Sequence, residues 1–155
     1  MRVVIQRVAR ASVSTGDEAL GAIGAGLLLF VGVGTGDDAQ VAGRLAAKCA
    51  EMRLFPGGSD SHFERSLLET GGEALVVSQF TLLADTRKGR RPSLTAAAPP
   101  DVAEPVVAAL VDHLRALGLE VATGRFGAMM RVELVNDGPV TIVLDSADLD
   151  RPRRG

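Results

Sequence analysis

The sequence has few of the residues that make disulfides, metal sites and aromatic cores. Its 155 residues include one cysteine, Cys49, two histidines and five phenylalanines, with no tryptophan or tyrosine. A single cysteine excludes an internal disulfide, and no His, Cys and carboxylate residues follow one another with metal-ligand spacing. We therefore predict no metal site and no cofactor, and a core built mainly from Val, Leu, Ala and Ile.

The chain also lacks a strong charge of one sign and a long apolar run. Its formal net charge is −2, so any contact with RNA must come from a local basic patch. No stretch approaches the roughly 20 apolar residues that a membrane helix needs. Arg2, Arg7 and Arg10 interrupt the N-terminal apolar run, which argues against a signal peptide. The sequence predicts a soluble, cytoplasmic protein with no membrane partner.

The mixed order of expected strands, with only two long helices, predicts one α+β domain over residues 1–145. That length is enough to bury a hydrophobic core. Two main helices are expected, one over residues 38–52 and one from Pro99-Pro100 to Gly118. A long polar loop with room for one turn of helix is expected over 56–73, and a second loop over 83–100. Residues 146–155 are polar and are expected to form a frayed C-terminal tail. Strands are expected over 2–13, 18–23, 27–31, 74–79, 119–123, 130–136 and 139–145.

Local signals define how the two helices begin and end. Asp37 with Gln40, and Asp101 with Glu104, have the spacing of capping boxes. Gly118 stands where a C-terminal cap belongs, and Pro105 is expected in the first turn, where its missing N–H costs little. The apolar stripes expected to face the core are Val41, Leu45, Cys49 and Met52 in the first helix, and Val106, Val107, Leu110, Val111, Leu114 and Leu117 in the second.

Conventional catalytic motifs are nearly absent. Cys49 falls on an apolar helix face and is interpreted as a buried small residue, not a nucleophile. His62 lies in a polar loop and His113 in the second helix, and neither neighbours a nucleophile motif, so surface or structural roles are expected. The glycine-rich run 32–36 is interpreted as a turn, because Asp37 replaces the last small residue of a dinucleotide fingerprint and no P-loop Gly-Lys-Ser/Thr follows.

Three segments remain as candidates for function. The first is a basic cluster with four cations within five residues, Arg87, Lys88, Arg90 and Arg91, which suits either phosphate binding or a solvated loop. It lies shortly after the second segment in the chain, which favours phosphate binding.

The second segment, Ser78-Gln79-Phe80-Thr81, follows an apolar strand. Its backbone N–H groups are able to form an oxyanion hole, or its hydroxyls simply bond a turn.

The third segment is Asn136-Asp137-Gly138-Pro139. Taken alone it has the composition of a hairpin turn, and only about 5–6% of X-Pro bonds in folded proteins are cis. Together with Met1–Val8 and Ser78–Leu82, however, the stretch Asn136–Thr141 resembles the D-aminoacyl-tRNA deacylases, and the similarity extends from residue 1 to about Leu144. The resemblance implies a fold of two sheet layers and one helical layer.

The resemblance also implies the site. It predicts that the Gly138-Pro139 peptide is cis and enters the active site of the partner in a homodimer, where its carbonyl oxygens fill the space of an L side chain. Asn136 belongs to this selecting segment, and Arg7 is expected to brace it. Phe126 and Met130 match positions that line the pocket for the terminal adenine, although their composition alone indicates ordinary core.

The activity implied is hydrolysis of the ester between a D-amino acid and the terminal adenosine of tRNA. N–H groups of Phe80 and Thr81 would face the carbonyl, Ser78 and Gln79 would shape the pocket floor, and the ribose 2′-hydroxyl would assist the attacking water. A Thr81 nucleophile is the competing mechanism, without a visible base. Because selection acts by rejecting L side chains, glycyl-tRNA is also an expected substrate.

Two rival functions remain open at this stage. One is a noncatalytic RNA- or nucleotide-binding module with the same fold, and the other is a small-molecule esterase or amidase that uses Ser78 or Thr81. The chain departs from many members of the family at His62-Phe63-Glu64-Arg65-Ser66, which puts in doubt any substrate contact that this stretch normally makes.

Overall fold

The computed structural model describes residues 1–58 and 60–152. Its strands are β1 (Arg2–Thr15), β2 (Glu18–Ile23), β3 (Gly26–Gly32), β4 (Arg53–Phe55), β5 (Arg65–Ser66), β6 (Glu73–Ser78), β7 (Val121–Thr123) and β8 (Arg131–Asp145). Its helices are α1 (Ala39–Glu51), α2 (Leu67–Thr70) and α3 (Pro100–Ala116), with 3₁₀ turns η1 (Phe80–Leu83) and η2 (Ser146–Asp148). The α+β class with two main helices is confirmed.

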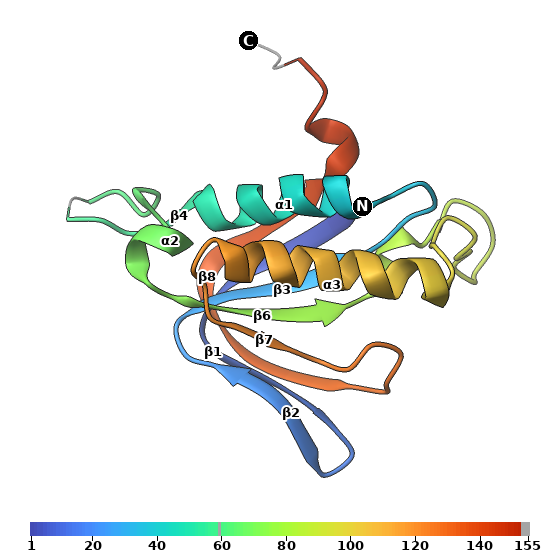
Figure 1. Cartoon of the computed structure of the whole chain (residues 1–155), viewed down its shortest axis with the longest axis horizontal. Helices are drawn as coiled ribbons and strands as arrows, with labels where there is room; N and C mark the ends of the chain where they lie inside the picture. Colours follow the sequence, from blue (N-terminus) through green and yellow to red (C-terminus); the bar gives the residue numbers. More distant parts are fainter. Residues whose placement is uncertain (59, 153–155) are drawn as a thin grey trace.

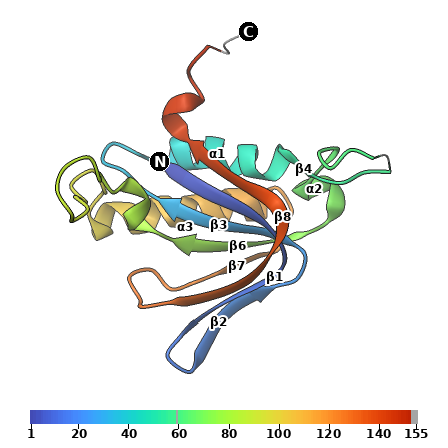
Figure 2. The ribbon, with the colours of Figure 1, turned by 180° about the vertical axis from the view of Figure 1, so that it is seen from behind.

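The central strands β3 and β6 are covered on both faces. Along β3, Leu27, Leu29 and Val31 face a core shared with α1 and α3, while Leu28 faces a second core on the opposite side. Because successive side chains of a strand point to opposite faces, an uninterrupted apolar run such as this marks a strand buried on both sides. Figures 1 and 2 show α1 and α3 side by side over one face.

One bent sheet supplies both β layers. Its path is β2-β1-β3-β6-β7, and β8 pairs with the far side of β1. The first half of β1 pairs with β3 and its second half with β2. Val8, Ala11 and Val13 in the bent part of β1 pack in the second core with Leu75 and Val77 of β6. The second layer is thus a continuation of the same sheet.

The groups that cap the N-termini of the two main helices differ from the prediction. Asp38, not Asp37, caps α1, and its Oδ1 accepts from the Val41 N–H at 2.9 Å. Asp37 instead accepts from the Gly34 N–H at 2.7 Å and pairs with the Met1 ammonium at 2.6 Å. The capping box expected at Asp101 and Glu104 was wrong, because α3 begins on the backbone carbonyl of Pro99 with no side-chain cap.

The rest of α3 follows the expected stripe with two corrections. Pro105 lies inside the helix, beyond the first turn in which it was expected, so its ring removes a backbone bond there. Leu117 was expected to face the core, but it follows the helix and is exposed. Gly118 has φ +93°, a left-handed conformation that suits glycine at a helix end.

The 56–73 stretch has the turn of helix allowed for it and also a short strand, and the tail is more ordered than expected. The 56–73 stretch contains β5 and α2, and Ser66 and Glu69 form a true capping box at the start of α2. The tail was expected to fray, but its first part is docked: the Ser146 N–H donates to the Met1 carbonyl at 2.9 Å, and Asp150 pairs with Arg44 at 2.6 Å. Residues 153–155 of the predicted tail lie outside the described residues.

Candidate active site

The site begins where β6 ends. The Gln79 N–H still pairs with β3, donating to the Val31 carbonyl oxygen at 2.8 Å, and the chain then turns into η1. Gly32 on β3 leaves room for this turn, because a Cβ at Gly32 would lie 2.9 Å from the Gln79 carbonyl oxygen and 2.5 Å from a Leu83 methyl carbon. A rigid strand therefore fixes where Phe80 and Thr81 stand.

Two backbone donors at the start of η1 are free. Leu82 N–H donates to Gln79 O and Ala84 N–H to Thr81 O, whereas the Phe80 and Thr81 N–H groups have no acceptor among the residues that the structure describes. The first N–H groups of any helix lack intrahelical partners. Phe80 and Thr81 are both exposed residues, so a ligand is able to approach the start of η1. Such a pair is able to bind a carbonyl oxygen that gains negative charge.

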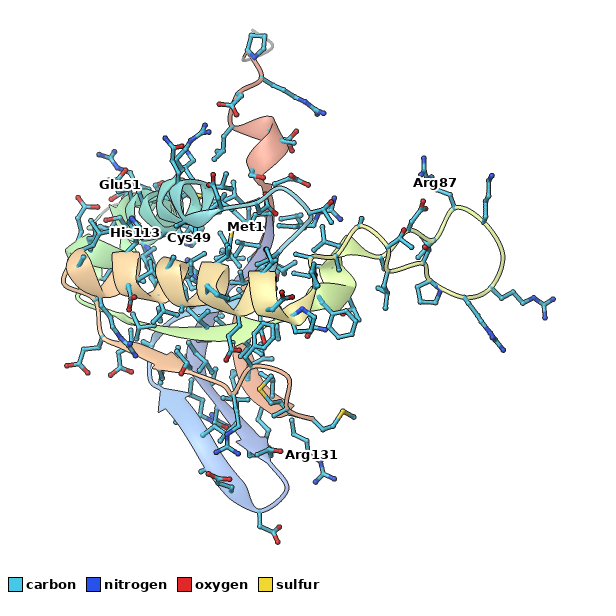
Figure 3. All side chains as sticks on the ribbon, turned by 45° about the vertical axis from the view of Figure 1, so that its right-hand side comes forward. Met1, Cys49, Glu51, Arg87, His113 and Arg131 are labelled. Atoms are coloured by element: carbon cyan, nitrogen blue, oxygen red, sulfur yellow. The ribbon has the colours of Figure 1, made fainter. Side chains whose placement is uncertain are left out.

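The Thr81 hydroxyl is held by a neighbouring amide. Gln79 Nε2 donates to Thr81 Oγ1, and no carboxylate or imidazole bonds that hydroxyl within residues 1–58 and 60–152. His113 Nδ1 lies 2.8 Å from the Ala109 carbonyl oxygen of its own helix. Burial raises the pKa of the Cys49 thiol to about 12, and Figure 3 shows Cys49 and His113 in the helical layer. A nucleophile with a base is not assembled here.

Three hollows adjoin Ser78. The apolar hollow, about 360 Å³, is walled mainly by Val31, Val33, Leu94, Ala98, Ala103, Val107 and Phe126. The methionine hollow, about 280 Å³, is lined by Met129, Met130 and Val132. The helix hollow, about 260 Å³, lies along α3 and is lined by Glu104, Asp112, Arg115, Thr123 and Phe126.

The predicted pocket residues divide among these hollows. Ser78 lines all three, and Gln79 and Phe80 line the apolar and methionine hollows. Phe126 lines the apolar and helix hollows, whereas Met130 lines the methionine hollow. The structure therefore brings Gln79 and Phe80 beside Ser78, places Phe126 and Met130 in different hollows around it, and leaves Thr81 outside the lining of all three. A flat apolar base and a small polar group can both be accommodated beside the free N–H donors.

The Asn136–Pro139 segment is a protrusion within a strand and not a hairpin turn. β8 runs unbroken from Arg131 to Asp145, where two strands were expected. Opposite it, Gln6 pairs with Thr141 and Val8 with Asn136, so the residues between Asn136 and Thr141 stand opposite Arg7 alone. Val140 is buried in the core, and the exposed residues 136–139 form the bulge. Asn136 Nδ2 closes the base of the bulge by donating to the carbonyl oxygens of Arg7 (2.9 Å) and Val140 (3.1 Å). The Gly138-Pro139 peptide is cis.

Arg7 joins this bulge to the body of the protein. Its side chain is buried, and its Nη1 donates to the Leu54 carbonyl oxygen at 2.6 Å. Its Nε lies 3.2 Å from the Asp137 carbonyl oxygen and 3.0 Å from Asp137 Oδ2. A buried guanidinium needs acceptors on all sides, and here they come from β4 and from the bulge.

The bulge does not line the hollows of its own chain. Arg7 pairs with Leu27, and Leu27 pairs with Ala74 of β6, whereas Ser78 lies four residues beyond Ala74. At the usual spacings of strands and residues, this separates the bulge from Ser78 by roughly 14 Å across the sheet and roughly 13 Å along it. Residues 136–139 are exposed, so the bulge is free to contact another molecule.

The basic segment forms a projecting loop. Backbone bonds between Asp85 and Ser93 close it, at 2.8 and 2.9 Å, and Figure 3 shows it extending beyond the start of α3. Arg87 folds back onto Asp85, with Nη2 to Oδ2 at 2.7 Å. That pairing raises the pKa of Arg87 and lowers the pKa of Asp85. Lys88, Arg90 and Arg91 are exposed and have no ion pair in the described part of the chain.

Two arginines that the sequence did not single out support the site. Arg2 donates from Nη1 to the Leu82 carbonyl oxygen of η1 at 2.7 Å and also pairs with Asp145. Arg125, next to Phe126, makes a bidentate pair with Glu18. In the sequence, only the position of Arg125 next to the pocket residue Phe126 could have indicated such a role. The partners of both arginines are far away in the sequence.

Two further features bear on ligands. Among the described residues, no three His, Cys, Asp or Glu side chains gather where they could hold a metal ion. No described helix has the length and apolar character needed to cross a bilayer.

Comparison with known proteins agrees with this geometry. The family model described as D-Tyr-tRNA(Tyr) deacylase matches residues 4–145. A D-aminoacyl-tRNA deacylase of Roseiflexus sp. (strain RS-1) is 61% identical over 153 residues, covering 99% of this chain and 98% of that protein. The corresponding protein of Chloroflexus aurantiacus (strain ATCC 29364 / DSM 637 / Y-400-fl) is 58% identical over 154 residues, covering 99% and 96%.

Solved structures show the same fold. One named as a c-Myc DNA unwinding element binding protein has a TM-score of 0.86 and 37% identity, covering 94% of this chain and 98% of that one. Another, of a probable eukaryotic D-amino acid tRNA deacylase, has a TM-score of 0.79 at 15% identity, covering 92% and 97%. The fold is thus that of the ester-hydrolysing deacylase class. The chain belongs to the D-Tyr-tRNA(Tyr) deacylase family, and the expectation from the sequence is confirmed.

Proposed function

We propose that this protein hydrolyses the ester that joins a D-amino acid to the terminal adenosine of tRNA, releasing the free D-amino acid and tRNA. The observation that carries the proposal is the pair of unpartnered N–H groups at Phe80 and Thr81, beside hollows lined by Ser78, Gln79 and Phe126. It rests also on membership of a family whose curated members are named D-aminoacyl-tRNA deacylases.

The proposed chemistry needs little from side chains. A water attacks the ester carbonyl carbon, the carbonyl oxygen becomes an oxyanion held by the two N–H groups, and the C–O bond to the ribose then breaks. The water's proton ends on the departing ribose oxygen, with the vicinal 2′-hydroxyl assisting the transfer. An aminoacyl ester is already reactive, so positioning and oxyanion stabilisation suffice. Ser78 and Gln79 shape the floor on which the carbonyl rests.

The terminal nucleoside is proposed to occupy the hollows lined by Phe126 and Met130. Phe126 and Phe80 give the apolar hollow aromatic walls, and most of its other lining residues are aliphatic, which suits the neutral face of a base. Lys88, Arg90 and Arg91, with Arg87 in a more constrained position, are proposed to contact phosphates of the incoming strand. The cytoplasm is the compartment in which we expect the protein to meet this substrate.

Chiral selection is proposed to come from the Gly138-Pro139 bulge of a partner subunit. The bulge of each chain is exposed and lies away from its own Ser78, so a homodimer with a two-fold axis would supply it to the other site. Its carbonyl oxygens would occupy the space that an L side chain requires. Sedimentation of the active enzyme should give a dimer; full activity in a monomer would contradict the composite site.

A filter that works by rejection cannot exclude an amino acid without a side chain. We therefore expect some hydrolysis of glycyl-tRNA. Complete resistance of glycyl-tRNA at high enzyme concentration would mean that selection grips the D side chain instead.

A nucleic-acid-binding module without catalysis is the second candidate, favoured by the name of one related structure. Release of free amino acid from D-tyrosyl-tRNA separates the two functions. A deacylase converts many substrate molecules per protein, whereas a binding module retains the ester and protects it.

A further inference from the structure

One wall of the site is a short irregular segment. Residues 124–130 connect β7 to β8, and they contribute to all three hollows through Gly124, Phe126, Gly127 and Met130 among others. Two backbone bonds hold the segment: the Gly124 N–H donates to the Val76 carbonyl oxygen at 3.1 Å, and the Ala128 N–H donates to the Arg125 carbonyl oxygen at 3.1 Å. The second of these is internal to the segment. The sheet therefore fixes the two ends of the segment, at Gly124 and at Arg131 of β8, which pairs with Ser14, and no backbone bond among the described residues ties the stretch between them to the sheet.

A side-chain pair ties the stretch between these two ends to the sheet. Arg125 Nη2 lies 2.7 Å from Glu18 Oε1, and Nη1 lies 3.1 Å from Glu18 Oε2, which is the bidentate geometry of a strong guanidinium–carboxylate pair. Glu18 begins β2 and pairs in register with Thr15 of β1. The carboxylate therefore stands on a hairpin whose Val13 and Ile23 are buried in the second core.

The contact of Arg125 is with Glu18 and not with the hollows. Arg125 lines none of the three hollows in the described part of the chain. Both terminal nitrogens of its guanidinium already meet the carboxylate. This geometry suits a residue that holds the backbone of its neighbours Phe126 and Gly127 in place.

We propose that the Arg125–Glu18 pair is a positioning pair that fixes the 124–130 wall and so sets how tightly the terminal nucleoside is held. The inference rests on the proposed function. Exposed ion pairs add little to global stability, but a connection whose backbone is tied to the sheet only at its two ends opens locally at low free energy, where one further tie has a large effect. The wall contacts the nucleoside and not the reacting carbonyl, so loss of the pair should raise KM and spare kcat.

The test uses the full chain with Glu18→Gln, Arg125→Gln, and the exchanged double variant Glu18→Arg/Arg125→Glu, on D-tyrosyl-tRNA. Each single variant should raise KM about three- to tenfold with kcat within about twofold, and the exchanged pair should recover most of the loss. Arg44→Gln, which removes the exposed pair with Asp150, is the matched control and should leave KM unchanged.

Amide hydrogen exchange gives a readout that does not depend on activity. Glu18→Gln should increase deuterium uptake in a peptide covering residues 124–130 and leave the rest of the sheet unchanged. An effect of Arg125→Gln without one of Glu18→Gln would mean that Arg125 contacts RNA directly and would overturn the inference. Failure of the Glu18→Arg/Arg125→Glu double variant to recover KM would also overturn the inference. Unchanged deuterium uptake over residues 124–130 in Glu18→Gln would overturn it as well. If the wild-type protein hydrolyses nothing, the proposed function fails while the uptake still tests the pair.

Discussion

Arg7 donates from Nη1 to the Leu54 carbonyl oxygen at 2.6 Å, linking the first strand to a residue 47 positions later in a buried contact. The same guanidinium reaches the Asp137 carbonyl oxygen on its other side. One side chain therefore sets the distance between β4 and the bulge that carries Gly138 and Pro139.

Replacement of Arg7 by Met should lower stability and loosen chiral selection together. The Leu54 carbonyl would be left buried without a donor, at a cost of about 1–3 kcal/mol, which corresponds to a fall in Tm of about 3–10 °C. Thermal unfolding and the ratio of D- to L-ester hydrolysis measure the two effects. Asp137→Asn keeps both main-chain contacts and serves as the control; an equal loss in that variant would show that the carboxylate, not the backbone contact, carries the role.

Phe80→Pro deletes one of the two proposed oxyanion donors while leaving the helix start favourable. Proline suits the first position of a helix, and Gln79, with φ −148° and ψ +83°, lies outside the α region that proline disfavours in the residue before it. We expect kcat to fall about 10²- to 10³-fold relative to Phe80→Ala, which removes the side chain and keeps the N–H. Equal kcat values in the two variants would place the oxyanion elsewhere.

Thr81→Ala should retain most of the wild-type rate. The Thr81 hydroxyl accepts from the Gln79 amide and has no base to activate it, so the proposed mechanism uses the Thr81 N–H and not its oxygen. Single-turnover hydrolysis of D-tyrosyl-tRNA measures this directly. Abolished turnover in a folded Thr81→Ala protein would restore the nucleophile mechanism.

The projecting basic loop predicts a salt effect. Lys88→Ala, Arg90→Ala and Arg91→Ala should each weaken tRNA binding and reduce the slope of log K against log salt by about 0.7–0.9. Arg87→Ala should do less, because Arg87 is held by Asp85. Binding titrations over a range of salt give the slopes, with Arg44→Ala as a control of equal charge change. Unaltered slopes in all three loop variants would assign the loop to solvent.

Cys49 predicts a pH dependence of stability. Burial raises the pKa of this thiol to about 12, whereas in the unfolded chain it ionises near its ordinary value of about 8.5. The unfolded state therefore loses the proton first, so the thiol's contribution to stability is complete below that value and is lost as pH rises toward 12. Cys49→Ala should show a weaker decline above pH 9 in urea titrations. The native thiol should also resist alkylation at pH 8.

The strands could be predicted from the sequence better than the ends of the helices. The apolar runs at 27–31 and 74–77 are unambiguous because the central strands are covered on both faces. The helix α3 begins where it was predicted, but its cap was mispredicted, because the carbonyl of Pro99 and not the side chain of Asp101 caps it. Capping by a backbone carbonyl cannot be recognised from the sequence, because every residue type has that group.

The site was predictable as segments, and their connections were not. Ser78–Thr81 and Gly138-Pro139 were visible because each follows a strand and matches a family motif. The Asn136–Pro139 stretch looked like a turn because its composition is that of a turn, although β1 pairs on both sides of it and keeps β8 continuous. Glu18 and Arg125 are 107 residues apart, and no local pattern joins them.

Side-by-side hydrolysis of D-tyrosyl-tRNA and L-tyrosyl-tRNA by the wild-type protein at low concentration tests the central claim most directly. We predict rapid release of tyrosine from the D ester, while the L ester is spared. Cleavage of neither ester would contradict the proposed activity and favour a binding module. Equal cleavage of both would contradict the selecting role of Gly138 and Pro139.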